Sequence, residues 1–167
     1  CRLGMVGVTG IGALSGAAWG SAAATETGTS TLTAGGSVTA NGALAITGVA
    51  TIDASSGNVT LNTTTNNCQG AVKIDGVNVT VVDAGAIDLG ASTVTGTYAV
   101  TATTGGDITD SGVLTITGAA TFTAANAQSI YLDGANTFSN TVTFGSGGTR
   151  ANVPIRDSND FALAALT

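Results

Sequence analysis

One stretch of the chain occurs twice with small changes. Residues 35–54 read GGSVTANGALAITGVATIDA and residues 105–124 read GGDITDSGVLTITGAATFTA, with eleven identical positions. The similarity continues downstream at the same offset, where Cys68 of the first copy corresponds to Phe138 of the second. A long unit that resembles its predecessor is typical of a solenoid, in which each coil buries its apolar side against the next coil.

Apolar residues alternate with small polar residues inside each copy. Leu44 and Ile46 alternate with their neighbours, Gly48 interrupts the pattern, and the alternation resumes at Ala50 and Ile52. This period of two predicts short strands joined by turns at Gly, Asn and Asp. We therefore expect an all-β fold, a single-stranded parallel β-helix (β-solenoid) with roughly 20–24 residues in each coil. On this basis one repeat would make about three coils and the chain after residue 35 about six.

The same alternation predicts which residues face the interior. Asn66 and Asn136 are expected at stacked turns, where their amides hydrogen-bond one coil to the next. The predicted inward residues are Val38, Leu44, Ile46, Ile52, Val59, Leu61, Cys68, Val72, Ile74, Val79, Val81, Ile87, Leu89, Ile108, Leu114, Ile116, Phe122, Ile130, Leu132, Phe138, Val142, Phe144, Ile155, Phe161 and Leu163.

The first residues form a separate apolar segment that is rich in glycine and alanine. No charge falls between Arg2 and Glu26, and the SAAA at 21–24 resembles the small-residue cleavage site of an export signal. The predicted organisation is therefore an apolar amino-terminal segment at 1–34, export-signal-like or docking, followed by a β-solenoid repeat domain at 35–167.

Two other interpretations of the amino-terminal segment stay open. Gly12, Gly16 and Gly20 have the GxxxG spacing of packed membrane helices, although so many glycines weaken a helix. Alternatively the segment is extended and docks on its own or a neighbouring subunit, which is the interpretation we favour. A membrane contact is expected only if the segment is a retained anchor.

Composition excludes several classes of function. The net charge is −6 with only 4 Lys+Arg, which argues against nucleic acid because phosphate neutralisation needs clustered basic residues. The chain has no His, which excludes Ser–His and Cys–His catalysis and His-based metal sites. Cys1 and Cys68 fit no zinc or CxxC spacing, and Cys68 is expected to be a small buried residue. No cofactor and no metal is predicted.

The remaining polar motifs carry weak signals. Oxygen ligands at the turns would suit calcium, but no complete calcium loop is present. Thr-x-Thr pairs could bind ice, yet their starts do not recur once per coil, so outward threonines on strands are the favoured interpretation. Three pairs of carboxylates could cleave polysaccharides, but their turn-rich surroundings favour a turn-forming role: Asp83 with Asp88, Asp107 with Asp110, and Asp157 with Asp160.

One stretch carries a family resemblance. GGDITDSGVLTITGAATFTA, followed by SIYLDGANTFSNTVTF, resembles the repeats of filamentous-haemagglutinin-type exoproteins and giant bacterial surface adhesins. The resemblance covers about residues 35–167. It implies export, a right-handed parallel β-helix, and a role in adhesion or cell-surface structure. The amino-terminal secretion domain of such exoproteins is not recognisable here, and no adhesive residue is carried over.

These observations leave three functions in competition. The first is a non-enzymatic, exported structural protein, located outside the cell or on its surface, that self-assembles head-to-tail into a filament or surface layer. The second is a glycan- or host-binding module of a large surface adhesin, and the third an ice-binding or carbohydrate-active β-helix. Because the sequence closes on FALAALT without a charged or helical cap, we favour the first, with other copies of the chain as the partner. The predicted assembly contacts are Leu3, Val6, Val8, Ile11, Leu14, Trp19, Phe161, Leu163 and Leu166.

Overall fold

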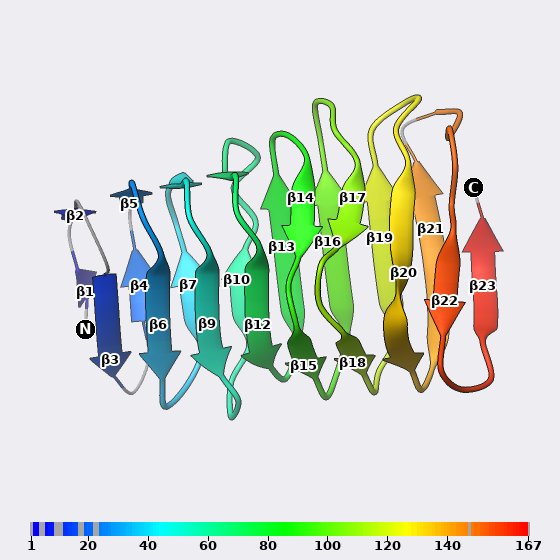
Figure 1. Ribbon diagram of the computed structural model, residues 1–167. Helices are drawn as coiled ribbons and strands as arrows, with labels where there is room; N and C mark the ends of the chain where they lie inside the picture. The colour runs from blue at the N-terminus through cyan, green and yellow to red at the C-terminus, as the bar shows by residue number, and fades with distance from the viewer. Residues whose placement is uncertain are drawn as a thin grey trace.

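In the computed structural model the chain forms a parallel β-solenoid (Figure 1). The structure describes residues 2–3, 6–8, 12–16, 19–21, 24–146 and 148–166, and the side chains of residues 25–145 and 148–166. In Figure 1 the chain descends through the front strands, rises through the back strands and advances from left to right, which makes the solenoid right-handed. The predicted fold class is therefore confirmed.

Each coil contributes three strands, which we assign to three faces in chain order. Face A is the nine-stranded sheet, formed by β1 (Arg2–Leu3), β4 (Trp19–Ser21), β7 (Val38–Ala40), β10 (Val59–Leu61), β13 (Val79–Asp83), β16 (Tyr98–Ala102), β19 (Ala120–Ala124), β21 (Thr141–Ser146) and β23 (Ala162–Leu166). Face B holds the strand that follows each face A strand: β2 (Val6–Val8), β5 (Ala24–Glu26), β8 (Leu44–Ile46), β11 (Asn67–Cys68), β14 (Ile87–Leu89), β17 (Ile108–Asp110), the start of β20 (Ile130–Phe138) and β22 (Ile155–Asp157).

Face C completes each coil. Its strands are β3 (Gly12–Gly16), β6 (Ser30–Ala34), β9 (Ala50–Ala54), β12 (Val72–Gly76), β15 (Ser92–Val94), β18 (Leu114–Ile116) and the end of β20. β20 runs around the corner between two faces, because its Ile130 pairs with Ile108 of β17 and its Phe138 pairs with Ile116 of β18.

The register of face A gives the length of a coil. Val38 pairs with Val59, Val59 with Val79, Val79 with Tyr98, and Tyr98 with Ala120. Each coil therefore holds about 21 residues, within the range of a parallel β-helix. The coils differ slightly in length, and the short turns between their strands suit Gly, Asn and Asp.

This coil length puts the two copies of the repeat out of phase. One repeat corresponds to ten strands, because Val38 lies in β7 and its counterpart Ile108 in β17. Ten strands at three per coil are three and one third coils, not three, so each residue of the second copy lies one face further round than its counterpart. Val38 is on face A and Ile108 on face B, and Ala50 is on face C while Ala120 is on face A.

The core runs along the axis as stacked layers of apolar side chains. Every residue from Val38 to Phe144 that the alternation predicts to be inward is buried. The prediction is wrong at the last coil, where Ile155 is only half-buried and Phe161 and Leu163 are 38% and 51% exposed. These residues lie in the last described layer, above which the structure describes no further coil. Besides several alanines, four larger residues of the described core were not identified from the sequence: Leu32, Val94, Tyr98 and Val100.

The sheets continue across the predicted boundary between residues 34 and 35. β1 pairs with β4 and β4 with β7, while β3 pairs with β6 and β6 with β9. The backbone of the described amino-terminal strands therefore adds coils to the same solenoid. In the described part of the chain, no helix is long and apolar enough to cross a membrane.

Candidate functional site

The last coil presents a layer of the core that no further coil of the described chain covers. Leu163 pairs with Val142 and Leu166 pairs with Phe144, and both partners are inward and buried. Leu163 and Leu166 continue these inward columns, yet they are 51% and 61% exposed. β23 is also the edge strand of face A, so this end combines exposed apolar side chains with an open strand edge.

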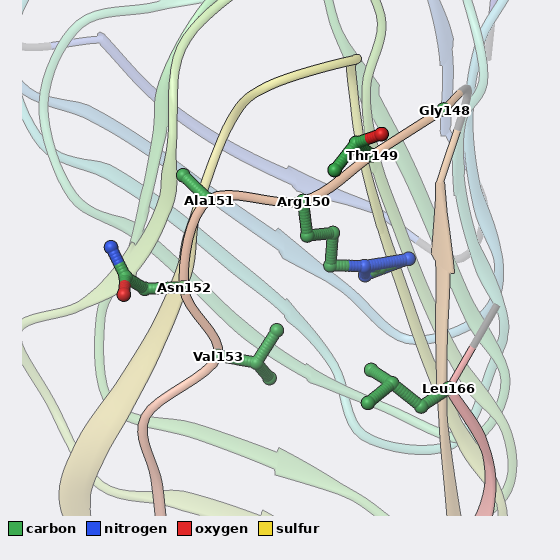
Figure 2. A pocket seen from close by; sticks show the side chains of 7 residues that line it. All are labelled: Gly148, Thr149, Arg150, Ala151, Asn152, Val153 and Leu166. Carbon is green, nitrogen blue, oxygen red and sulfur yellow. The ribbon is translucent and has the colours of Figure 1, made fainter.

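A cavity opens beside this uncovered layer. It has a volume of about 520 Å³ and lies between residues 148–153 and Leu166 (Figure 2). The Arg150 side chain extends into it from the 148–153 segment, and burial lowers the pKa of its guanidinium. The segment is held to the coil before it by backbone bonds, in which the amide of Ala127 donates to the carbonyl of Thr149 and that of Ile130 to the carbonyl of Asn152.

The strands that carry five of the predicted amino-terminal contacts lie at the opposite end of the solenoid from β23 (Figure 1). These strands are β1, β2, β3 and β4, which carry Leu3, Val6, Val8, Leu14 and Trp19. The side chains of these five residues, and Ile11 as a whole, lie outside the described residues. Within one chain the two predicted groups do not meet, so a contact between them requires a second copy.

Two buried amides fasten the corners of the solenoid. Asn66 Oδ1 accepts a hydrogen bond from the Leu44 amide at 2.8 Å, and Asn136 Oδ1 accepts one from the Leu114 amide at 2.8 Å. Asn66 and Asn136 occupy equivalent positions of the two copies, as do Leu44 and Leu114. The same hydrogen bond therefore recurs in the second copy, one face further round. The predicted coil-to-coil role of these amides is confirmed, although they do not stack on each other.

Two carboxylates perform a similar task beside the amides. Asp83 is fully buried, and its oxygens accept hydrogen bonds from the amides of Cys68 at 2.8 Å and Gly85 at 2.9 Å. Asp157 likewise accepts from the amide of Phe138, the counterpart of Cys68, at 3.2 Å. Burial, and then the neighbouring Asp83, raises the pKa of the Cys68 thiol to about 12. Cys68 is thus buried as predicted.

Two of the other predicted carboxylates bind backbone, while Asp88 accepts a hydrogen bond from the Ser111 hydroxyl at 2.7 Å. Asp107 accepts from the amide of Ser129 at 2.7 Å, and Asp110 accepts from the amide of Asp133 at 3.1 Å and from Nδ2 of Asn136 at 2.6 Å. Both contacts join neighbouring coils and do not form a turn as predicted, and Asp110 lies within β17. Among residues with described side chains, no group of three His, Cys, Asp or Glu residues could hold a metal ion.

An exposed ladder of polar side chains borders face A. The Asn58 amide donates to Ser37 Oγ at 3.1 Å, Asn58 Oδ1 accepts from the Asn78 amide at 3.1 Å, and Asn78 Oδ1 accepts from the Thr97 amide at 3.0 Å. A separate recess of about 530 Å³ lies at a corner, lined by Thr65, Asn67, Ala84, Gly85, Thr104 and Gly105.

Ser92 and Tyr98 are among the polar residues of the interior that sequence reasoning did not identify. Ser92 is buried, and its hydroxyl accepts from the Ile74 amide at 3.0 Å and donates to the Gly90 carbonyl at 2.9 Å. Tyr98 is buried as well, and burial raises the pKa of its hydroxyl, an effect that Ser92 partly offsets. The signal for Tyr98 was its inward place in the alternating segment YAVTA.

Comparison with known proteins identifies the repeat. Residues 6–75 and 76–145 each match the family described as repeats of unknown function (DUF5649), and the two matched segments are equal in length. No curated protein and no solved structure gives a significant match. Since the two matches are consecutive and cover most of the chain, the protein belongs to the DUF5649 repeat family.

Proposed function

We propose that this protein is a non-enzymatic, exported structural protein that assembles head-to-tail into a filament or a layer at the cell surface. The observation that carries the proposal is the last described coil, where Leu163 and Leu166 extend the inward columns of the core and are 51% and 61% exposed. Burying such a side chain is worth about 1.5–3 kcal/mol, which favours adding another layer.

The geometry of the strands supports a second copy as that layer. All described pairings are parallel, and face A has β1 at one edge and β23 at the other. A copy translated along the axis could therefore pair its β1 with β23 and continue the ladder in the same sense. Such a heterologous contact does not close, so it propagates as a fibre. This is also the contact that the predicted amino-terminal residues would make.

The polar chemistry of the chain is consistent with a structural role. Asp83, Asp107, Asp110 and Asp157 use their oxygens to bind backbone amides and an amide side chain of neighbouring coils. A carboxylate held in this way stabilises a corner of the fold and is poorly placed to act on a substrate.

A second candidate is a glycan-binding module of a surface adhesin. The recess at Thr65, Asn67 and Thr104 favours it, because uncharged hydroxyl and amide groups suit the hydroxyls of a neutral sugar. The recess offers few polar groups, whereas the uncovered apolar layer at β23 combines side chains with an open strand edge, so we place this candidate second.

Electron microscopy and sedimentation of the full chain test the proposal. We expect fibres from the wild type. Leu163→Asp should give monomers or short oligomers, because the new carboxylate would lie in the end-to-end joint, the contact between β23 of one copy and β1 of the next. Val113→Asp is the matched control: Val113 is 46% exposed but lies away from the end, so this variant should form fibres as the wild type does.

Deletion of residues 1–24 tests the other side of the joint. We expect it to shorten the fibres as much as Leu163→Asp does. An intact chain that stays monomeric at high concentration, or a truncated chain that polymerises as well as the full one, contradicts head-to-tail assembly through these ends. Retention of the chain by an insoluble neutral polysaccharide would then favour the second candidate.

A further inference from the structure

Face A carries no charge on its outer surface between β7 and β21, a range whose strands are all described. The alternation of these strands turns eleven residues outward, and they are small and uncharged: Thr39, Thr60, Thr80, Val82, Ala99, Thr101, Thr121, Thr123, Thr141, Thr143 and Gly145. Thr39, Thr60 and Thr80 are direct neighbours across the sheet, and Thr121 is the neighbour of Thr143. The polar ladder along one border of this face is uncharged as well.

Over the same coils, faces B and C carry the charges instead. Asp53, Lys73 and Asp75 lie at outward positions of β9 and β12 on face C. Asp88 lies at an outward position of β14 and Arg156 at one of β22, Asp110 is half-buried on β17, and Asp133 is exposed on β20. Because five of these seven side chains are acidic, the two faces are predominantly negative, in keeping with the net charge of −6.

Comparison of the two copies shows that charge follows the face and not the repeat. The rotation by one face would carry the charges of face C in the first copy onto face A in the second. At those positions the sequence changes instead: Asp53 becomes Thr123, Lys73 becomes Thr143, and Asp75 becomes Gly145.

The opposite change occurs where face A residues rotate onto face B. Ser37, which precedes β7, has Asp107 as its counterpart before β17. The buried Ala40 of β7 has the half-buried Asp110 as its counterpart, at the matching inward position of β17. Repetition alone would have spread the charges over all three faces. Their exclusion from face A in both copies therefore belongs to the face and not to the repeated sequence.

We propose that face A is a lateral interface, through which two copies of the solenoid pair face to face about a two-fold axis. Acidic faces B and C of two copies repel each other, whereas two neutral faces can approach without bringing like charges together. Small side chains on a sheet allow close packing, with the sheets about 10 Å apart. A two-fold contact uses the same patch on both copies and closes as a pair.

The size of the face sets the strength of the pairing. Six strands about 4.8 Å apart make a face about 24 Å long and about 15 Å wide, which is less than half of a standard interface. Pairing of single chains is therefore weak, and it strengthens when solenoids are extended end to end. Salt also strengthens it, because the acidic groups on the other faces are then screened.

Sedimentation equilibrium of the full chain tests the proposal in the Leu163→Asp background, which removes the end-to-end joint. We expect a monomer–dimer equilibrium that shifts toward dimer as salt is raised. Adding Thr80→Asp or Thr80→Lys should raise the dissociation constant at least about tenfold, equivalent to about 1.4 kcal/mol, because a two-fold axis brings either charge close to its own copy. Thr80→Val should leave the dimer intact.

Thr115→Asp is the matched control, because Thr115 is an exposed outward threonine on face C. It should leave the dissociation constant within about twofold of the parent, and far-UV circular dichroism should show the same fold for all variants. A chain that shows no dimer at high concentration and high salt contradicts the proposal. So do equal effects of the Thr80 and Thr115 variants. Failure of the end-to-end joint would show separately, as fibres that Leu163→Asp does not shorten.

Discussion

The two copies of the repeat, residues 6–75 and 76–145, follow one strand pattern but fill the interior differently. Ile52, Cys68 and Ile74 of the first copy become Phe122, Phe138 and Phe144 in the second. All six side chains are buried. The alternation thus decides which positions point inward, while the size of each inward side chain is free to change.

The larger side chains of the second copy form an aromatic cluster. The ring of Phe122 lies 5.9 Å from Tyr98 in an edge-to-face arrangement, 6.0 Å from Phe138, and 6.1 Å from Phe144, on which it stacks. Such pairs add about 0.5–1.5 kcal/mol each beyond the area that they bury. The first copy has no aromatic residue at the three equivalent positions. The aromatic contacts that stabilise the second copy are therefore centred on one ring, that of Phe122.

Removal of that ring has the largest expected effect. Phe122→Ala should lower the free energy of unfolding by about 3–5 kcal/mol, because it opens a cavity against three other rings. The counterpart Ile52→Ala should lose less, nearer about 2–3 kcal/mol, since fewer atoms are removed. Urea unfolding followed by circular dichroism measures both. Equal losses in the two copies would show that the aromatic cluster adds nothing to the packing.

The buried amides give the next largest effect and sharpen the comparison. Asn66→Ala leaves the buried Leu44 amide without its acceptor, and Asn136→Ala does the same to Leu114. An orphaned buried group costs about 1–3 kcal/mol. Asn136→Ala should cost more, because Nδ2 of Asn136 also binds the Asp110 carboxylate and charge-assisted bonds are the stronger ones.

A double-mutant cycle isolates this difference. In the Asp110→Asn background the excess loss from Asn136→Ala over Asn66→Ala should shrink, as measured by the same urea transitions. An excess that is unchanged in that background would assign the difference to something other than Asp110.

The smallest effect concerns Cys68, which stands where the second copy has phenylalanine. Because the pKa of this thiol is raised to about 12 in the folded chain, the unfolded chain loses the thiol proton first as pH rises. The contribution of the neutral thiol to the free energy of unfolding is therefore fully present at neutral pH. It is lost as the pH rises from the ordinary thiol pKa to about 12. Thermal melts from about pH 8 upward should show a steeper decline for the wild type than for Cys68→Ala.

Thiol labelling checks the same residue at neutral pH. Cys68 should react only after unfolding, in a Cys1→Ser background that removes the other thiol. Rapid labelling of the folded chain would contradict its burial.

Local patterns in the sequence predicted the fold and most of the core. Alternation over a few residues is enough to separate Val38 and Leu44 from their outward neighbours, and the repeated Asn66 and Asn136 were correctly expected to join coils. The phase of the copies was missed, because it depends on the sum of all turn lengths around a coil. A coil only slightly shorter than one third of the repeat is enough to rotate the second copy by one face.

The candidate site was less predictable for the same reason. The exposure of Leu163 and Leu166 depends on what packs above them, which alternation does not encode. The uncharged face A was also hidden in the sequence: its threonines start at unequal intervals and become a row only when coils of unequal length align them.

Solid-state NMR contacts between neighbouring coils test the rotation of the copies most directly. Starting from Thr39 and stepping across face A, the account predicts contacts with Thr60, then Thr80, then Ala99, so that the third step falls short of the second copy's equivalent of Thr39. Three steps that instead lead from Thr39 to that counterpart, Thr109, would place both copies in phase on one face. That result would contradict the rotation and, with it, the assignment of a single uncharged face.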